Sequence, residues 1–409
     1  MLGGMIHTLV EIMDKDKVQE DKMKKLKIAI VTTTFFPQVG GAEYQIKWFA
    51  EELAKRGHEV YLFTPYEAEE FIDIDDRGFP KNIALRKKNA NVLSDAFRMF
   101  YVFTKWIREI KPDVVHAHFA FSSGFLAVIT KLIHKAPVVI TSHEDDILVI
   151  KEKGYRYGMG LKLHRRLLVN LSLKLCDANV VVSSPMKKYA IKSGSREKKL
   201  HVIPNMYVPP IAEIEDGFIE ITKDKYAIPR NKKILLSVSR LHQQKGLKYL
   251  IESVKNIISY DENVHLVIVG VGEEEEMLKR IVKKLDLDNF VTFTGFVDDA
   301  EKHALIKGCD VFCMPSLNEA FGISLFDPMY YGKSIVASND EGIQEALGTA
   351  GLTVPKKDPI SLSKAIIKIL QDENLRENLS ERGRDRYKLF MLDRAIGSYL
   401  KIYKELLRK

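Results

Sequence analysis

The sequence has few cysteines and no long apolar run, and both absences narrow the class of protein. Its 409 residues include only Cys176, Cys309 and Cys313, which are too few and too apolar in context for a disulfide framework. Cys309 and Cys313 flank an apolar segment in which buried thiols are more typical than metal ligands. No apolar stretch reaches the roughly 18 residues that span a bilayer. We therefore expect a protein of the cytoplasm without a membrane-spanning helix.

The first 23 residues also lack the features of a signal peptide. They contain no basic segment before their short apolar stretch, which runs directly into mixed charges. We expect residues 1–23 to be a disordered tail or an over-long start, because the first predicted strand follows Met23 at once. The rest of the chain, in a sequence that is 46% apolar, is long enough for two or more buried cores.

Strand and helix patterns alternate along the chain in two blocks, which is typical of parallel sheets covered on both faces. The first block opens with a strand at residues 27–33 and a helix at 42–57, whose apolar stripe is Ile46, Phe49, Ala50 and Leu53. The Pro-rich segment 204–210 has the composition of a linker. The second block then begins near Pro229, so the sequence predicts an α/β protein with two sheets.

An acidic motif in the second block carries the strongest chemical signal. Glu319 stands eight residues before Asp327, with Phe321 and Gly322 between them and helix-forming residues after. A helix starting near Phe321 would place free backbone amides beside Glu319 and would return Asp327 to the same face two turns later. The alternative is that two carboxylates merely decorate the start of a helix.

A basic loop precedes this motif. Arg240 and Lys245 lie five residues apart, between the predicted strand 233–239 and the predicted helix 247–258. Two cations at the carboxyl end of a parallel strand are suited to a diphosphate, because ligands of open α/β sheets bind at that edge. The alternative is a solvated charged loop.

Together these residues resemble the retaining glycosyltransferases of family 4, which have the two-lobed GT-B fold. That family has two acids separated by seven residues with a Phe-Gly step between them, and an Arg and a Lys five apart after the first strand of its second lobe. Three further segments match in order and spacing: VGGAE at 39–43, DVVHAHF at 113–119 and VIPN at 202–205. The resemblance extends over nearly the whole chain from Lys24.

The resemblance implies a division of the chain into two Rossmann-like, doubly wound lobes that face each other across a cleft. Residues 24–207 would form the acceptor lobe, and residues 208–388 would form the lobe that binds the nucleotide sugar. Residues 389–409 would form a helix that crosses back to the first lobe.

The resemblance also assigns roles to particular residues. Arg240 and Lys245 would hold the diphosphate, Glu319 would contact the donor sugar, and His118 would lie near the reacting carbon. For His118 the alternative is a structural histidine at the end of a strand. The remaining implied positions are Gly40, Gly41, Gly270, Gly295, Phe321, Gly322, Ile323 and Asp327 on the donor side, and Glu43 and His143 on the acceptor side. No metal ion or other cofactor is implied.

The sequence departs from the family pattern at several of these positions. Asp327 replaces a Glu, Pro328 replaces an Ala, and Glu341 replaces a Gly. Ser239 and Met206 also stand where the family has Gly. We expect these changes to affect the pocket for the donor sugar more than the fold.

The function implied is metal-independent, retaining transfer of a hexosyl unit from a UDP- or GDP-sugar to the hydroxyl of a glycan or lipid-linked acceptor. Two other functions fit the same residues. A nucleotide-sugar epimerase of the same fold would act on the donor alone, and a non-catalytic binder would hold the donor without reaction.

Charge is unevenly divided between the two halves. Residues 1–210 contain 33 Lys and Arg against 24 Asp and Glu, a net charge of +9, whereas the remainder has a net charge of −1. Within the first half, the segment Leu163 to Leu175 combines cations with a leucine at every fourth position. Such a helix can lie on an anionic membrane, at the inner face of the cell membrane for a cytoplasmic protein. The alternative is a stripe that faces the core.

Two other interpretations of charge are weaker. No recognisable nucleic-acid-binding module accompanies the basic residues, so we expect no nucleic-acid partner. The segment Asp73 to Asp76 contains an Asp-x-Asp step typical of metal-dependent glycosyltransferases. It lies in an irregular stretch, residues 66–91, and does not follow an apolar strand, so we expect a solvated turn.

Overall fold

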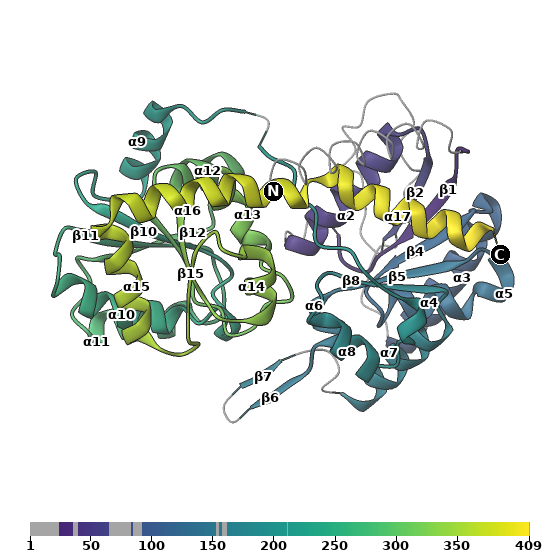
Figure 1. The fold of residues 1–409 in the computed structure, drawn as a ribbon. Helices are drawn as coiled ribbons and strands as arrows, with labels where there is room; N and C mark the ends of the chain where they lie inside the picture. Colours follow the sequence, from purple (N-terminus) through teal and green to yellow (C-terminus); the bar gives the residue numbers. More distant parts are fainter. Residues whose placement is uncertain are drawn as a thin grey trace.

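The structure is a computed structural model that describes residues 24–35, 40–64, 83–84, 92–152, 155–157, 162–210 and 212–408. It has two lobes, each built around one parallel sheet, and they lie side by side in Figure 1. The N-terminal tail, the Asp-x-Asp step and most of the irregular stretch at 66–91 lie outside the described residues.

The N-terminal lobe contains a parallel sheet of seven strands in the order β3-β2-β1-β4-β5-β8-β9. Its strands are β1 (Lys27–Val31), β2 (Glu59–Thr64), β3 (Ile83–Ala84), β4 (Val114–His118), β5 (Val138–Ser142), β8 (Ala178–Val181) and β9 (Leu200–Val202). Its helices are α2 (Gly41–Lys55), α3 (Val92–Ile110), α4 (Ser123–Ile129), α5 (Lys131–His134), α6 (Glu144–Ile147), α7 (Leu163–Leu175) and α8 (Met186–Lys192), with a 3-10 turn η2 (Glu197–Lys199). A separate antiparallel hairpin, β6 (Ile150–Glu152) and β7 (Tyr155–Tyr157), projects from this lobe (Figure 1).

The C-terminal lobe contains a parallel sheet of six strands in the order β12-β11-β10-β13-β14-β15. Its strands are β10 (Lys233–Val238), β11 (Val264–Val269), β12 (Val291–Gly295), β13 (Val311–Met314), β14 (Ser334–Ser338) and β15 (Leu352–Val354). Its helices are α9 (Asp216–Lys225), α10 (Leu247–Ile258), α11 (Glu275–Lys284), α12 (Asp299–Lys307), α13 (Phe326–Tyr330), α14 (Glu341–Leu347), α15 (Pro359–Gln371) and α16 (Glu373–Arg386). The 3-10 turns are η3 (Gln243–Lys245), η4 (Ile323–Leu325) and η5 (Tyr387–Phe390), and the last helix is α17 (Leu392–Leu407).

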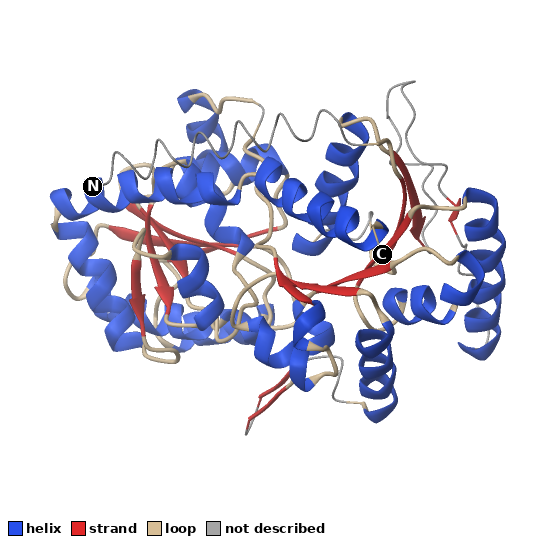
Figure 2. Ribbon diagram, turned by 45° about the vertical axis from the view of Figure 1, so that its right-hand side comes forward, coloured by secondary structure: helices blue, strands red, loops and turns tan. Residues whose placement is uncertain are grey.

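Helices cover both faces of each sheet (Figure 2), and the strand sequences show why. Every residue of β4, β5, β8, β11, β13 and β14 is buried, as expected for central parallel strands packed on both sides. The predicted stripe of α2 is confirmed, because Ile46, Phe49 and Leu53 are fully buried against the first sheet. The sequence-based prediction of two doubly wound parallel sheets is therefore confirmed.

Two segments cross between the lobes, and they run side by side. The backbone N–H of Tyr207 donates to the carbonyl of Phe390 at 2.7 Å, and that of Leu392 donates to the carbonyl of Tyr207 at 3.1 Å. Beyond this crossing, α17 packs on the N-terminal lobe, while α16 remains on the C-terminal lobe (Figure 1). The last described helix, α17, thus lies on the same lobe as β1.

A buried polar network fixes α17 to the first sheet. The Nδ1 atom of His116, on β4, lies 2.5 Å from the hydroxyl of Tyr403, and its Nε2 atom lies 2.8 Å from the hydroxyl of Thr141. The Thr141 hydroxyl is also 3.2 Å from that of Tyr399. Since His116 and Tyr403 are completely buried, both groups depend on each other for hydrogen bonding.

The leucine repeat of α7 does not face the core. Leu163, Leu167, Leu171 and Leu175 are exposed, and Val169 and Leu173 are the apolar residues that α7 buries. The alternative of a core-facing stripe is therefore wrong. No helix among the described residues is both long and apolar enough to cross a membrane.

The three cysteines are buried free thiols, as expected. Burial raises the pKa of both Cys176 and Cys309 to about 12. These thiols therefore stay protonated near neutral pH.

Replacing Tyr403 with Phe tests the anchoring of α17. The change should lower the free energy of unfolding by about 1–3 kcal/mol, because the Nδ1 atom of His116 would lose its buried partner. Chemical denaturation measures this loss. The matched control is Tyr101→Phe, which removes a hydroxyl from a side chain that is 70% exposed and should have little effect. Equal stabilities of the two variants would contradict the proposed anchor.

Candidate functional site

The loops that follow β10 and β13 are neighbours, and they bring two predicted site residues together. The two strands pair directly in the sheet, so their carboxyl ends are adjacent. The Nζ atom of Lys245 lies 2.5 Å from an Oε atom of Glu319, and the two side chains are only 15% and 8% exposed. Residues 74 positions apart thus form a largely buried ion pair at the edge where parallel sheets bind ligands.

A glycine allows this close approach. Gly246 has a φ of +63° and directly precedes α10. A Cβ atom at this position would lie 2.2 Å from the carbonyl oxygen of Pro315, just after β13. Only glycine avoids that clash and adopts this backbone conformation readily, so Gly246 positions Lys245 against the second loop.

Arg240 lies at the start of the same loop but does not join the ion pair. Its side chain is exposed, and within the described part of the chain it has no hydrogen bond or ion pair. The structure thus brings Lys245 and Glu319 into contact and leaves the guanidinium of Arg240 directed to solvent.

The acidic motif is a loop where the sequence predicted a helix. Residues 318–322 are irregular, a 3-10 turn begins at Ile323, and α13 has only five residues. Gly322 has a φ of +86°, which is incompatible with a continuous helix from Phe321. The prediction that two helical turns place Glu319 and Asp327 on one face is therefore wrong.

Asp327 instead contacts the segment between the lobes. Its Oδ1 atom accepts a hydrogen bond from the hydroxyl of Tyr207 at 3.1 Å, and its Oδ2 atom lies 3.5 Å from Nζ of Lys302. Burial and the carboxylate of Asp327 raise the pKa of Tyr207. Asp327 thus links the crossing segment to α12, and its carboxylate is held by two partners.

The glycine-rich loop of the N-terminal lobe reaches the other lobe at the acidic motif. A Cβ atom on Gly41, the first residue of α2, would lie 3.0 Å from the terminal methyl carbon of Ile323. A Cβ atom on Gly40 would lie 2.6 Å from an Oε atom of Glu43. The structure therefore places Gly41 beside Ile323, and a side chain at either glycine would have to displace the end of the Glu43 or the Ile323 side chain.

Three other donor-side positions have distinct environments. Gly270, with a φ of +129°, would place a Cβ atom 2.0 Å from the Ser239 carbonyl, so it supports the loop that begins at Arg240. Gly295, with a φ of +71°, has open space around the position of a Cβ atom. Phe321 is 1% exposed and its ring packs on Phe390, so its side chain is not available to a ligand.

His118 and His143 form a buried pair at the carboxyl ends of adjacent strands. The Nδ1 atom of His118 lies 3.2 Å from Nε2 of His143, and the rings are stacked. The Nε2 atom of His118 is buried and has no hydrogen-bond partner among the described residues. The next residue, Phe119, has a φ of +72°, an uncommon conformation for a bulky residue. Strain beside a buried, unpaired nitrogen is typical of a site that binds a ligand.

Contacts between the lobes include residues that the sequence analysis did not single out. Among the described residues, the polar contacts that bridge the lobes include those of the Tyr44 hydroxyl with Asp299 at 2.8 Å, Gln244 with Glu144 at 2.5 Å, the Ser184 backbone with Glu345 at 2.9 Å, and Lys188 with Glu341. Sequence patterns carry no signal for such pairs, because each joins positions at least 100 residues apart. Glu341, one of the departures from the family pattern, contributes to one of them.

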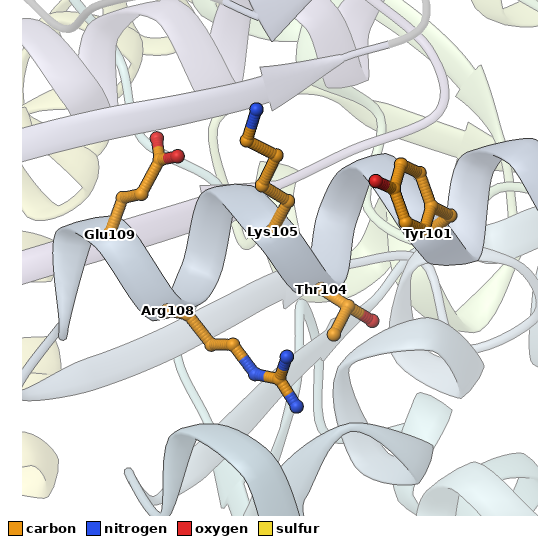
Figure 3. Close-up of a pocket in the computed structure, with 5 residues that line it drawn as sticks. All are labelled: Tyr101, Thr104, Lys105, Arg108 and Glu109. Atoms are coloured by element: carbon orange, nitrogen blue, oxygen red, sulfur yellow. The ribbon is translucent and has the colours of Figure 1, made fainter.

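A hollow lies elsewhere, on α3. It has a volume of about 330 Å³ and is lined by Tyr101, Thr104, Lys105, Arg108 and Glu109, all from α3 (Figure 3). Lys105 and Arg108 point in opposite directions in this view. By contrast, Lys245 and Glu319 line a small hollow between β10 and β13. In the described ranges, no group of three or more His, Cys, Asp and Glu residues could hold a metal ion.

Comparison with known families agrees with this geometry. Residues 39–207 match the model of Glycosyltransferase Family 4, and residues 218–386 match that of Glycosyl transferases group 1. The chain belongs to the family 4 glycosyltransferases. It is therefore a transferase enzyme with the GT-B fold.

Relatives and solved structures share nearly the full length of this glycosyltransferase. An uncharacterized glycosyltransferase of Methanocaldococcus jannaschii is 28% identical over 389 residues, covering 93% of this chain and 98% of the relative. A phosphatidyl-myo-inositol mannosyltransferase of Mycolicibacterium smegmatis is 26% identical over 386 residues, covering 92% and 93%. The structure of Anabaena HepE in complex with UDP and glucose has a TM-score of 0.76 at 17% identity, covering 93% of this chain and all of HepE.

The buried histidines predict how stability depends on pH. Burial lowers the pKa of His143 from 6.5 to about 4, and burial together with the charge of His143 lowers that of His116 to about 3. Both must become neutral on folding, so their contribution is complete above about pH 6.5 and is lost as the pH falls toward 4. The free energy of unfolding should fall in this window by up to about 1.4 kcal/mol per pH unit for each histidine.

Denaturation at several pH values measures this slope. His143→Gln should make the slope shallower, because one group that must lose its proton on folding is removed. His164→Gln is the control, since His164 is exposed on α7. A stability that does not change across this window would contradict the prediction.

Proposed function

We propose that this glycosyltransferase moves a hexosyl unit from a nucleoside diphosphate sugar to an acceptor hydroxyl, with retention of anomeric configuration and without a metal ion. The observation that carries the proposal is the buried contact between Lys245 and Glu319. It places an ammonium group and a carboxylate together at the ligand-binding edge of the C-terminal sheet.

Lys245 and Arg240 would bind the diphosphate. An ammonium has three N–H donors, so Lys245 can contact Glu319 and a phosphate oxygen at the same time. The exposed guanidinium of Arg240, five residues earlier on the same loop, would supply the second positive charge. Two cations would then stabilise the charge that develops on the leaving group, which is the task a metal ion performs in other transferases.

The transfer step would take place on one face of the sugar. The bond from the anomeric carbon to the diphosphate oxygen breaks, and a bond from the same carbon to the acceptor oxygen forms on the same side. The proton of the acceptor hydroxyl passes to the departing phosphate oxygen. No side chain is required as a covalent nucleophile, so catalysis would depend on orientation and on stabilisation of charge.

The other site residues would orient the two substrates. Glu319 would accept hydrogen bonds from hydroxyls of the donor sugar, and Asp327, held by Tyr207 and Lys302, would do the same for the ribose. The backbone of Gly40 and Gly41 would approach the donor from the other lobe. The unpaired Nε2 atom of His118 would face the reacting centre, where a hydrogen bond to a sugar hydroxyl would satisfy it.

We propose UDP- or GDP-sugars as donors and a lipid-linked molecule or an anionic glycan as the acceptor. UDP and glucose are the ligands of the structurally similar HepE, and a related enzyme is named a phosphatidyl-myo-inositol mannosyltransferase. The net charge of +9 in residues 1–210 also favours an anionic acceptor. The enzyme would then work in the cytoplasm, at the inner face of the cell membrane.

Replacing Lys245 with Ala should reduce the turnover number by about 100-fold or more, because the diphosphate would lose a positive charge at the bond that breaks. Steady-state kinetics with a sugar nucleotide and a glycan or lipid acceptor measures the change. Lys248→Ala is the matched control, since Lys248 lies three residues away with its Nζ atom over the ring of Tyr249. Unaltered kinetics in a folded Lys245→Ala protein would exclude the role of Lys245.

A panel of UDP-, GDP- and ADP-sugars should identify the donor by thermal unfolding. The correct donor should raise the melting temperature, because it binds only the folded state. The rise should be smaller in Lys245→Ala, and stabilisation by none of the sugar nucleotides would contradict the proposal.

Incubation with the stabilising donor alone separates the other two functions. An isomerised sugar nucleotide would indicate an epimerase of the same fold. Binding without transfer to any acceptor and without hydrolysis would indicate a non-catalytic binder.

A further inference from the structure

The outward face of α7 carries leucines where a surface helix normally carries polar side chains. Leu163, Leu167, Leu171 and Leu175 are 72%, 61%, 41% and 46% exposed. A step of four residues advances about 40° beyond a full turn, so the four side chains cover about 120° of the helix surface. They point away from Val169 and Leu173, which pack into the lobe. The helix thus has one apolar face in the lobe and a second apolar face turned to solvent.

Cations surround this leucine face, and α7 contains no acidic residue. Lys162, Arg166 and Lys174 are all exposed. Lys174 lies within the angle that the leucines cover, and Arg166 lies about 60° outside it. An apolar stripe with a cationic border is the pattern of a helix that lies in the interface of an anionic membrane.

Neighbouring elements beside α7 also carry exposed apolar side chains. The side-chain amide of Asn170 donates to the carbonyl of Ser193 at 3.2 Å, which places the end of α8 beside α7. There Ile191 is 46% exposed and is followed by the exposed Lys192. An exposed apolar side chain of α8 thus also lies next to an exposed lysine.

At the other end, α5 continues the surface. Nζ of Lys131 lies 2.6 Å from a carboxylate oxygen of Asp177, just after α7. The next residue, Leu132, is 90% exposed. Figure 1 shows α7 on the outside of the N-terminal lobe, next to α4 and α8. The apolar and basic surface therefore belongs to one lobe and is open to solvent.

We propose that the leucine face of α7 docks this enzyme on an anionic lipid bilayer, with the helix parallel to the membrane surface. The four leucines would enter the boundary between headgroups and acyl chains, while the bordering cations would contact anionic headgroups. The role of this docking rests on the proposed function, because docking would bring the N-terminal lobe to a lipid-linked acceptor. The binding itself requires neither donor nor transfer, so it is tested separately.

Flotation of the full chain with vesicles tests the docking. At low salt the protein should float with phosphatidylcholine vesicles that contain phosphatidylglycerol, but not with phosphatidylcholine alone, and added salt should weaken binding. The double variant Leu163→Ser, Leu167→Ser should bind the anionic vesicles about tenfold less tightly, because it loses two of the inserted side chains. Its melting temperature and its response to a sugar nucleotide should stay unchanged, since neither leucine contacts the site.

The matched control is the double variant Ile221→Ser, Ile360→Ser, which replaces side chains that are 64% and 59% exposed on the C-terminal lobe. It should float like the unmodified protein. Absence of flotation with anionic vesicles, or equal flotation of the leucine variant, would overturn the proposal. So would sedimentation showing that the leucine face joins two copies of the chain, with the leucine variant monomeric. Loss of transfer in Lys245→Ala with normal flotation would leave the docking intact and bear only on the proposed chemistry.

Discussion

The site depends on one constraint, the parallel direction of the strands within each sheet. All carboxyl ends of a parallel sheet lie at one edge, so loops that are far apart in sequence meet there. In the C-terminal sheet β10 and β13 are neighbours, and the loops after them carry Lys245 and Glu319. In the N-terminal sheet β4 and β5 are neighbours, and the ends of these strands carry His118 and His143. Each lobe therefore assembles its half of the site from adjacent strand ends.

The two halves are joined in different ways along the cleft. The crossing segments are apolar and buried, since Phe390 packs on Phe321 and Tyr207 lies against Phe326. The contacts away from the crossing are polar, and in one of them, between Lys188 and Glu341, both side chains are more than half exposed. Exposed ion pairs contribute about 0–1 kcal/mol, so the contact between Lys188 and Glu341 can open at little cost while the crossing holds. This division suits a cycle in which lobes close on the donor and exclude water.

The sequence was most informative where a pattern repeats or where family motifs match. The stripe of α2 and the two blocks of strands appear as predicted because hydrophobic periodicity reflects burial directly. It was least informative in the acidic motif. Glu319 to Asp327 contains good helix formers, but Gly322 in the left-handed region delays the helix to Ile323, and nothing in local propensity indicates that.

Which face of α7 is buried could not be predicted from the sequence either. Leucines spaced by four residues indicate one apolar face, and periodicity alone does not say whether that face meets the core or solvent. Here Val169 and Leu173 occupy the core side instead. Contacts between lobes are also invisible in a single sequence, because Tyr44 and Asp299 are separated by 255 positions and belong to no common motif.

The two lobes differ in how their charge is arranged: one has a few cations at the candidate site, and the other has a large net positive charge spread over its surface. The lobe that would bind the diphosphate carries almost no net charge, at −1 for residues 211–409. A diphosphate would therefore be recognised by cations close to it, because salt screens exposed charges beyond about 8 Å under physiological conditions. The loop between β10 and α10 supplies two such cations, Arg240 and Lys245. The excess of +9 lies in the other lobe, spread over surfaces such as that of α7. A surface many charges wide can attract an anionic bilayer or glycan without specific geometry, whereas catalysis on a diphosphate requires a few charges held at fixed positions. Because the C-terminal lobe has little net charge, its general surface would not attract anionic sugar nucleotides, and only the cations of the site would bind them.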